Sequence, residues 1–99
     1  MMIKVSISTY GSVNKKSGWH LKELTLKQAK ATVDDVLKST SLEDGTVMFD
    51  IVADNDGVKK DYSILLNGRP LWNPKDLKSE IKSGDLITAT GILEMLGGG

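Results

Sequence analysis

Apolar and polar residues alternate along the first part of the chain, which predicts a half-buried strand from Met2 to Tyr10. The inward positions of this strand are Ile3, Val5 and Ile7. The segment from Gly11 to Gly18 is rich in turn-forming residues and ends the strand. Alternation resumes from Trp19 to Leu26, and we expect Trp19, Leu21 and one of Leu24 and Leu26 to face inward. Two such runs predict an antiparallel pair of strands.

The apolar period then changes from two residues to that of a helix. Thr32, with Asp35 three residues later, matches a capping box in its Asp form. Asp34 and Asp35 would lie in the first turn of the helix, where the helix dipole stabilises negative charge. The pattern predicts a short helix that ends before Asp44 and Gly45. Its buried face would consist of Ala29, Val33, Val36, Leu37 and Thr40.

The second half of the chain predicts further strands separated by strong turn signals. Residues 46–53 alternate and are interpreted as a strand, followed by a turn at 54–57. A strand over 61–66 stops at Asn67-Gly68, and Pro70 assigns the short strand after it to a sheet edge. Residues 73–76 open a helical turn that carries Leu77 and Ile81. The last strand, 86–93, runs toward the C-terminus.

These elements predict an α+β fold with a mixed sheet of four to five strands. It would have one main helix and a short second helical turn. One helix covers only one face of a sheet, so the other face should be open to solvent or to a partner.

Composition narrows the class of function. Ninety-nine residues predict one domain. The net charge is zero, which makes a nucleic-acid partner unexpected, and no apolar run is long enough to span a bilayer. The chain has no cysteine and a single histidine, His20, so thiol catalysis and histidine or thiolate metal sites are excluded. We therefore expect a cytoplasmic, soluble protein that is a monomer on its own and binds no metal, cofactor or membrane.

The chain ends in three glycines, Gly97, Gly98 and Gly99. Glycine makes up about 7% of average proteins, so this run has a chance frequency of about one in 3000. Lacking Cβ atoms, such residues are thin and reach extended conformations that other residues adopt poorly. A tail of this kind is able to enter a narrow active site. A linker remnant or a frayed end is the alternative interpretation.

Several segments together resemble the ubiquitin-like β-grasp family, in particular its sulfur-carrier branch. That branch contains the small molybdopterin-synthase subunit, the thiamine sulfur carrier and the ubiquitin-related modifiers. The segments occur in the family's order, which strengthens each weak likeness. They are the opening strand at 2–5, the threonine-capped helix start at 31–37, the strand and Asn-Gly turn at 64–71, the Gly-Asp step at 81–87, and Gly98-Gly99.

The resemblance implies that the chain is a carried substrate and not an enzyme. The Gly99 carboxylate would be the acyl donor, with Gly98 and Gly97 as its stem. An E1-like enzyme would use ATP and Mg²⁺ to adenylate it, and a thiocarboxylate or an isopeptide conjugate would follow. The run Ile92–Leu96 lacks the prolines that commonly precede the diglycine in sulfur carriers, so sulfur carriage and protein conjugation both remain open.

The partner-binding residues predicted for this role are Leu65, Leu86, Met95 and Leu96. Alternation directs Leu65 and Leu86 to the open face of the sheet, where they could form an apolar patch for the E1-like enzyme. Scattered surface leucines are the alternative. We expect residues 1–96 to form the domain and residues 97–99 a flexible tail. A non-conjugated interaction module and the small subunit of a molybdopterin-synthase-like complex are the competing functions.

Overall fold

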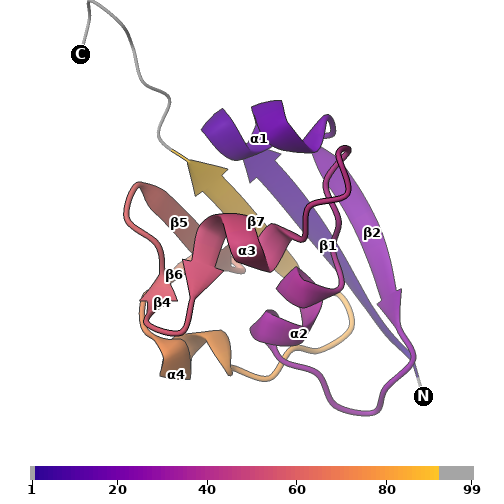
Figure 1. Ribbon diagram of the computed structural model, residues 1–99. Helices are drawn as coiled ribbons and strands as arrows, with labels where there is room; N and C mark the ends of the chain where they lie inside the picture. The colour runs from indigo at the N-terminus through magenta and orange to yellow at the C-terminus, as the bar shows by residue number, and fades with distance from the viewer. Residues whose placement is uncertain (1, 92–99) are drawn as a thin grey trace, which may run out of the picture.

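The computed structural model describes residues 2–91 and contains a five-stranded sheet with helices packed against it (Figure 1). The strand order is β2-β1-β7-β5-β6, and a separate two-stranded ribbon pairs β3 with β4. The strands are β1 (Ile3–Tyr10), β2 (Leu21–Leu26), β3 (Ala53–Asp54), β4 (Gly57–Val58), β5 (Tyr62–Leu66), β6 (Arg69–Leu71) and β7 (Leu86–Gly91). The helices are α1 (Gly11–Ser17), α2 (Val33–Lys38), α3 (Met48–Val52) and α4 (Pro74–Leu77).

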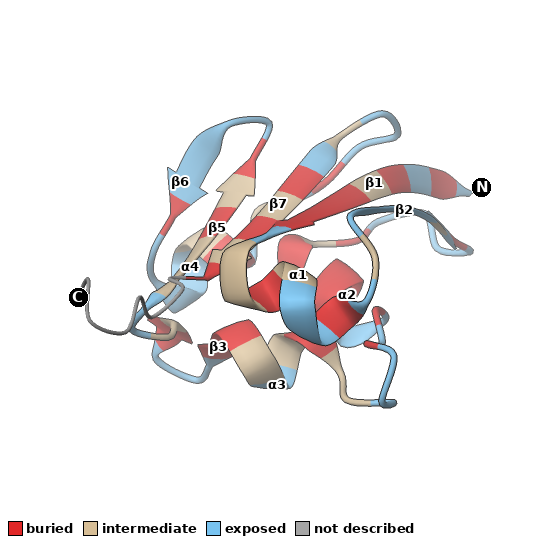
Figure 2. Ribbon diagram, turned by 90° about the horizontal axis from the view of Figure 1, so that it is seen from above, coloured by how far each residue is buried: buried red, intermediate tan, exposed pale blue. Residues whose placement is uncertain are grey.

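The last strand lies at the centre of the sheet. β7 runs parallel to β1, with Ile7 opposite Ile87, and antiparallel to β5, with Ile64 opposite Ala89. These four side chains are fully buried and lie on the face that the helices cover. Figure 2 shows the helices on one side of the sheet and none on the other. The predicted open face is therefore confirmed for the described part of the chain.

The turn signals of the second half are confirmed. β5 and β6 form a hairpin whose two connecting residues, Asn67 and Gly68, have positive φ angles of 53° and 86°. Such a turn requires residues that tolerate this backbone, which is why the Asn-Gly pair is informative. β6 carries Pro70 at the edge of the sheet, as the proline predicts. Asn55 and Asp56 connect β3 to β4, and Gly57 at the start of β4 has a positive φ angle of 110°.

Helices α2 and α4 each follow a polar N-cap residue that forms a reciprocal capping box. At α2 the Asp35 N–H donates to Thr32 Oγ1 (3.3 Å), and the Thr32 N–H donates to Asp35 Oδ2 (2.9 Å). The same exchange joins Asn73 and Asp76 at α4. The predicted helix start at Thr32 is confirmed. Ala29 lies outside the helix and is exposed, so its assignment to the buried face was wrong.

Residues 11–17 form a helix where the sequence indicated only a turn. The segment has no side-chain cap at its start and no acidic residue in its first turn, so the usual helix signals are missing. Its stability comes from packing. Val13 and Ser17, one turn apart, are both fully buried, and Asn14 Nδ2 and Ser17 Oγ donate to the Trp19 carbonyl at 3.1 and 2.6 Å. Tertiary contacts thus impose the helix.

Residues 48–52 form helix α3, so the strand predicted over 46–53 was wrong. Met48 and Val52, four residues apart, are both fully buried, as on one helical face. The alternation of Val47, Phe49 and Ile51 resembled a strand because a short apolar run fits both periods. With α1 and α3 added, residues 2–91 contain four helical segments in place of one main helix and one turn.

Leu21 was predicted to face inward but is 63% exposed. The antiparallel register places Leu21 opposite Ser8, whose neighbours in β1 that point to the core are Ile7 and Thr9. Leu21 therefore lies on the open face, and Leu24 and Leu26 take the inward positions of β2. The antiparallel pairing of β1 and β2 is confirmed, although helix α1 connects them.

Candidate docking face and tail exit

The open face of the sheet carries side chains from all five strands. Register assigns to it the alternate positions of each strand, beginning with Lys4, Ser6 and Ser8 of β1. Small hydroxyl side chains fill its middle: Ser6, Ser8, Ser63, Thr88 and Thr90, which we call the hydroxyl strip. Ser8 Oγ and Thr88 Oγ1 are 3.0 Å apart and share a hydrogen bond between β1 and β7. Short side chains therefore line the middle of the open face.

Leu65 and Leu86 lie on this face, on neighbouring strands. Leu65 is opposite Thr88 in β7, and Leu86 precedes Thr88 by two residues, so the two leucines are diagonal neighbours. Leu86 is 37% exposed and Leu65 is half-buried. The structure therefore brings together the two described residues of the predicted docking set.

Pro70 lies beside this pair of leucines and was not predicted to be a docking residue. It lies directly opposite Leu65 in the β5–β6 hairpin and is exposed. The signal was present in the sequence, because a two-residue Asn-Gly loop fixes the register of a hairpin and thereby the partner of Leu65. Leu65, Pro70 and Leu86 are called the apolar patch below. A patch on adjacent strands is a more specific feature than scattered surface leucines.

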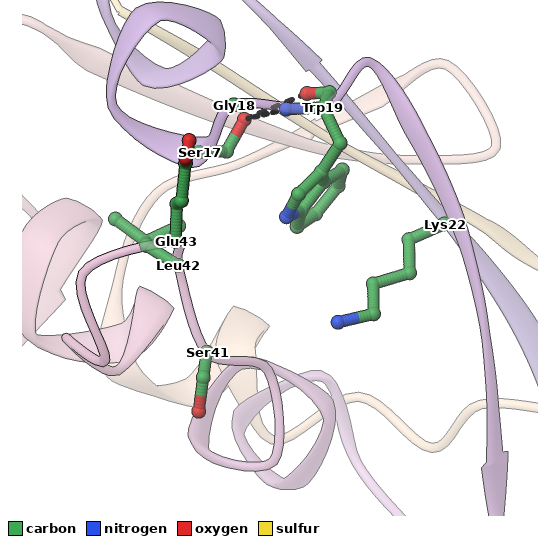
Figure 3. A pocket seen from close by; sticks show the side chains of 7 residues that line it. All are labelled: Ser17, Gly18, Trp19, Lys22, Ser41, Leu42 and Glu43. Carbon is green, nitrogen blue, oxygen red and sulfur yellow. Dashed lines mark hydrogen bonds between the residues drawn. The ribbon is translucent and has the colours of Figure 1, made fainter.

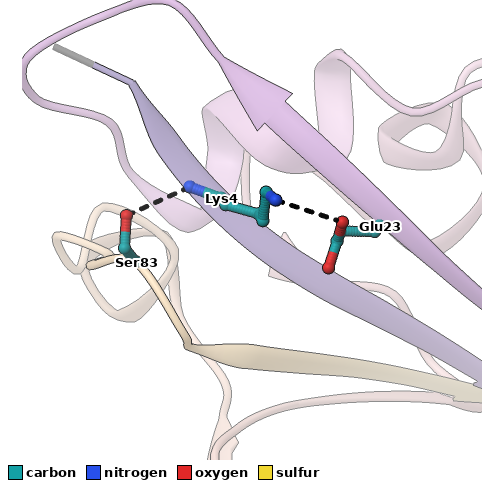
Figure 4. A network of polar contacts seen from close by, with 3 residues as sticks. All are labelled: Lys4, Glu23 and Ser83. Carbon is teal, nitrogen blue, oxygen red and sulfur yellow. Dashed lines mark hydrogen bonds and ion pairs between the residues drawn. The ribbon is translucent and has the colours of Figure 1, made fainter.

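The β1–β2 side of the open face carries aromatic and charged residues. Tyr10 is 48% exposed and its ring meets the His20 ring edge-on, with centroids 4.7 Å apart. His20 Nδ1 also lies 3.0 Å from the Thr9 carbonyl oxygen, and the residue is exposed just before β2. Further along, Lys4 Nζ lies 3.6 Å from Glu23 Oε1, and the Lys4 N–H donates to Ser83 Oγ (Figure 4). Such exposed ion pairs contribute little stability.

The chain leaves the described fold at Gly91, at a crowded point. Gly91 lies opposite Tyr62 of β5 and forms a parallel bridge with Gly11, the first residue of α1. A Cβ atom on Gly91 would collide with Ser12 Oγ, and one on Gly11 would collide with the Gly91 carbonyl oxygen. Lys16 Nζ lies 3.3 Å from Tyr62 Oη beside this point. Two glycines thus allow α1 to pack against the end of β7.

The remaining predicted site residues lie outside the described residues. These are Met95, Leu96, Gly97, Gly98 and Gly99. Eight residues follow Gly91, and an extended chain of that length spans at most about 28 Å. Within residues 2–91, no group of three or more His, Asp or Glu side chains is placed to hold a metal ion, and no helix is long and apolar enough to cross a membrane.

A shallow pocket of about 230 Å³ lies away from the docking face, between the start of β2 and the loop after α2 (Figure 3). Trp19 and Leu42 supply its apolar wall, and Lys22 Nζ lies 5.6 Å from the centre of the Trp19 ring. Ser17 Oγ, which donates to the Trp19 carbonyl, borders the pocket. Neither Leu65 nor Leu86, the two predicted docking residues that the structure describes, lines it.

Among residues 2–91, shifted pKa values are found for Asp34 and Asp44, and neither residue lies on the open face. Burial raises the pKa of Asp34 above 3.8, and the Lys38 ammonium partly opposes this. Hydrogen bonds from Thr46 lower the pKa of the exposed Asp44, whose Oδ1 accepts from the Thr46 N–H at 2.9 Å.

The sheet order, the parallel central strands and the helices on one face define a β-grasp fold of the ubiquitin-like class. Solved structures share it over most of the chain. The HVO 2177 protein of Haloferax volcanii has a TM-score of 0.70 at 21% identity, covering 94% of this chain and 86% of that chain. A candidate molybdopterin converting factor, subunit 1, from Pyrococcus furiosus has a TM-score of 0.66 at 20% identity, covering 92% and 99%.

Small archaeal modifier protein 1 of Methanosarcina acetivorans is similar with a TM-score of 0.64 at 17% identity, covering 96% of this chain and 98% of that chain. No protein-family model matches the chain, and no curated protein matches it in sequence. The resemblance to the sulfur-carrier branch of the ubiquitin-like proteins is thus confirmed at the level of the fold.

Proposed function

We propose that this chain is a ubiquitin-like carrier, either of sulfur or as a protein modifier, whose Gly99 carboxylate an E1-like enzyme activates. The observation that supports the proposal is the position of β7. This strand is the central strand of the sheet and ends at Gly91, so the chain that continues to Gly97–Gly99 starts from the centre of the sheet. Fold neighbours named as a molybdopterin converting factor and as small archaeal modifiers favour the same role.

The proposed chemistry starts from a carboxylate, which is a poor acyl donor. Attack of the Gly99 carboxylate on the α-phosphorus of ATP would form an acyl-adenylate and release pyrophosphate, with Mg²⁺ on the phosphates. A persulfide on a partner would then displace AMP, and a second thiol would cleave the resulting S–S bond, which leaves a thiocarboxylate and a disulfide. Alternatively, a partner thiol would displace AMP and pass the acyl group to a lysine amine as an isopeptide.

In this proposal the fold supplies recognition and the partner supplies the catalytic groups. The apolar patch of Leu65, Pro70 and Leu86 would dock against the activating enzyme. Interface cores are rich in apolar side chains and depleted of charge, and the neighbouring hydroxyl strip also carries no charge. Met95 and Leu96 would extend the contact toward the active site, with Gly97–Gly99 passing through its entrance.

The direct test is incubation of the full chain with ATP, Mg²⁺, a sulfide donor and each E1-like enzyme of the same genome, followed by intact mass. The proposal expects an adenylate, and then a sulfur-for-oxygen exchange at Gly99 or a conjugate. Deletion of Gly98-Gly99 should abolish every product, while the far-ultraviolet circular dichroism spectrum stays unchanged. Absence of all three products with every enzyme would contradict the proposal.

A second candidate function is the small subunit of a molybdopterin-synthase-like complex. The Pyrococcus furiosus neighbour, whose name refers to such a subunit, favours it. The discriminating observation is a stable complex with a larger subunit in which residues 92–99 become protected from proteolysis. A carrier that binds its activating enzyme only transiently would elute alone in size-exclusion chromatography.

A further inference from the structure

The side chain of Asn67 joins the β5–β6 turn to the start of β7. Asn67 Nδ2 donates to Asp85 Oδ1 at 3.0 Å, and Asn67 Oδ1 accepts from the Leu86 N–H at 2.8 Å. We call these two hydrogen bonds the amide clasp. The backbone N–H of Asn67 also donates to the Leu86 carbonyl oxygen at 2.8 Å. Asp85 is itself held in place, because its Oδ2 accepts from the Lys82 N–H at 2.7 Å and its carbonyl oxygen accepts from the Ser6 N–H at 3.0 Å.

Asn67 is followed by Gly68, and this pair can undergo a reaction of its own. The Gly68 nitrogen attacks Asn67 Cγ, the Cγ–Nδ2 bond breaks, and the Gly68 N–H proton leaves with that nitrogen as ammonia. Water then opens the resulting five-membered imide at either carbonyl, which gives aspartate or isoaspartate. Glycine favours the attack because no side chain shields its nitrogen. Asn67 and Gly68 are both exposed, and a Cβ atom on Gly68 would meet no atom within 4 Å, so water has access to the turn.

The folded turn opposes this reaction. The positive φ angles of Asn67 and Gly68, 53° and 86°, are those of a type I′ turn. The first central residue of such a turn has a ψ angle of about +30°, which directs the next nitrogen away from its side chain. The ring closes only when the Gly68 nitrogen lies on the same side as the Asn67 Cβ atom. The turn must therefore open first, and the amide clasp must break in the same step because it holds both Nδ2 and Oδ1.

We propose that Asn67 is a deamidation site whose rate is controlled by the amide clasp. The reactants are the chain's own amide and water. The aspartate product directs a second carboxylate at Asp85, and the two like charges disfavour each other. The isoaspartate product inserts the Cβ methylene into the main chain, which lengthens a two-residue hairpin loop whose geometry depends on its length. Loss of ammonia makes the change irreversible, so it releases the start of β7, including Leu86. The inference depends on the turn alone and stands whether or not the proposed carrier function is correct.

The test incubates the folded full chain at slightly alkaline pH and follows deamidation by tandem mass spectrometry of the tryptic peptide 61–75. This peptide contains Asn67 and Asn73. Asn73 precedes Pro74, whose nitrogen carries no hydrogen, so it serves as an unreactive control in the same peptide. The chain unfolded in guanidinium chloride should deamidate at Asn67 at least about tenfold faster than the folded chain, because the turn no longer holds the two groups apart.

Asp85→Ala should raise the rate at Asn67 in the folded chain by about tenfold or more, because Nδ2 loses a charge-assisted hydrogen bond. Thr32→Ala is the control for a general loss of stability, since its hydrogen bond lies at the start of α2, and it should leave the rate unchanged. The proposal is overturned if Asp85→Ala deamidates no faster than the native chain. It is also overturned if the folded and unfolded chains deamidate equally fast.

The deamidated chain tests the consequence for the fold. Its additional negative charge separates it from the native chain by anion exchange, and amide hydrogen exchange is then measured by NMR on both. The Leu86 amide, which donates to Asn67 Oδ1, should exchange faster after deamidation. The Thr9 amide, which donates to the His20 carbonyl oxygen between β1 and β2, should exchange at the same rate in both. Unchanged exchange at Leu86 would show that the start of β7 is not released and would contradict the proposal.

Discussion

The contact between Gly11 and Gly91 provides the sharpest test of how the fold holds the base of the C-terminal segment. Gly11 has a φ angle of +62°, and a Cβ atom there would collide with the Gly91 carbonyl oxygen. Gly11→Ala therefore adds two costs. An L-residue in the left-handed region costs about 1–2 kcal/mol, and overpacking costs a further 1–3 kcal/mol or so. The expected destabilisation is about 2–5 kcal/mol.

Gly45→Ala is the matched control. Gly45 also has a positive φ angle, +91°, but a Cβ atom there would meet no atom within 4 Å. This variant should show the backbone cost alone. The effect of replacing glycine on the entropy of the unfolded chain is the same in both variants and cancels in the comparison. The difference between the two, about 1–3 kcal/mol, therefore isolates the contact with β7.

Urea unfolding followed by circular dichroism measures both variants, and the midpoint and slope together give the free energy of unfolding. In thermal unfolding, each kcal/mol corresponds to about 4–8 °C for a domain of this size. Gly11→Ala should unfold clearly below Gly45→Ala. Equal stabilities would refute the reasoning, because the collision with a backbone oxygen cannot be relieved by a change of rotamer.

Three further predictions concern the docking face, the helix caps and the pH dependence. Leu65→Asp should weaken binding to an activating enzyme in a pull-down or titration, while Thr25→Asp, at the far edge of the same face, should not; equal effects would exclude the apolar patch as the contact. Thr32→Ala should lower the free energy of unfolding by about 1 kcal/mol, because it removes the acceptor for the Asp35 N–H, and an unchanged urea midpoint would contradict this. Burial raises the pKa of Asp34, so the stability contributed by its neutral form is present below pH 3.8 and is lost as the pH rises through the raised pKa. The stability of Asp34→Asn relative to the native chain should therefore increase with pH above 3.8, and a constant difference would show that the carboxylate is not buried.

The sequence predicted the elements whose signals are local. Alternation in β1, the reciprocal cap at Thr32, and the Asn-Gly turn of the β5–β6 hairpin each depend on a few neighbouring residues, and each is confirmed. Leu65 and Leu86 were assigned to the open face for the same reason, because alternation alone determines which face a strand residue occupies.

The failures occur where distant contacts decide the conformation. α1 has no capping signal in the sequence. It forms because Val13 and Ser17 are buried and because Ser17 Oγ donates a hydrogen bond to the Trp19 carbonyl. α3 has an apolar run too short to distinguish a helix from a strand. Leu21 faces outward because pairing with Ser8 fixes its side, and that register depends on the length of the connection through α1. Contacts between residues distant in the sequence thus determined α1 and the side of Leu21, whereas the local pattern of α3 fits both a helix and a strand.

The two faces of the sheet have different roles in this proposal: one contributes to stability and the other to partner binding. The helices bury Ile7, Ile64 and Ile87 on one face, and substitutions there would act through stability. On the other face, the apolar patch contributes little to stability because Leu65, Pro70 and Leu86 remain partly or largely exposed. Changes in the apolar patch should therefore alter partner binding without unfolding the chain, whereas changes at Gly11 should do the reverse. Measuring stability and activation on the same variants would thus show whether recognition and folding are separable in this protein.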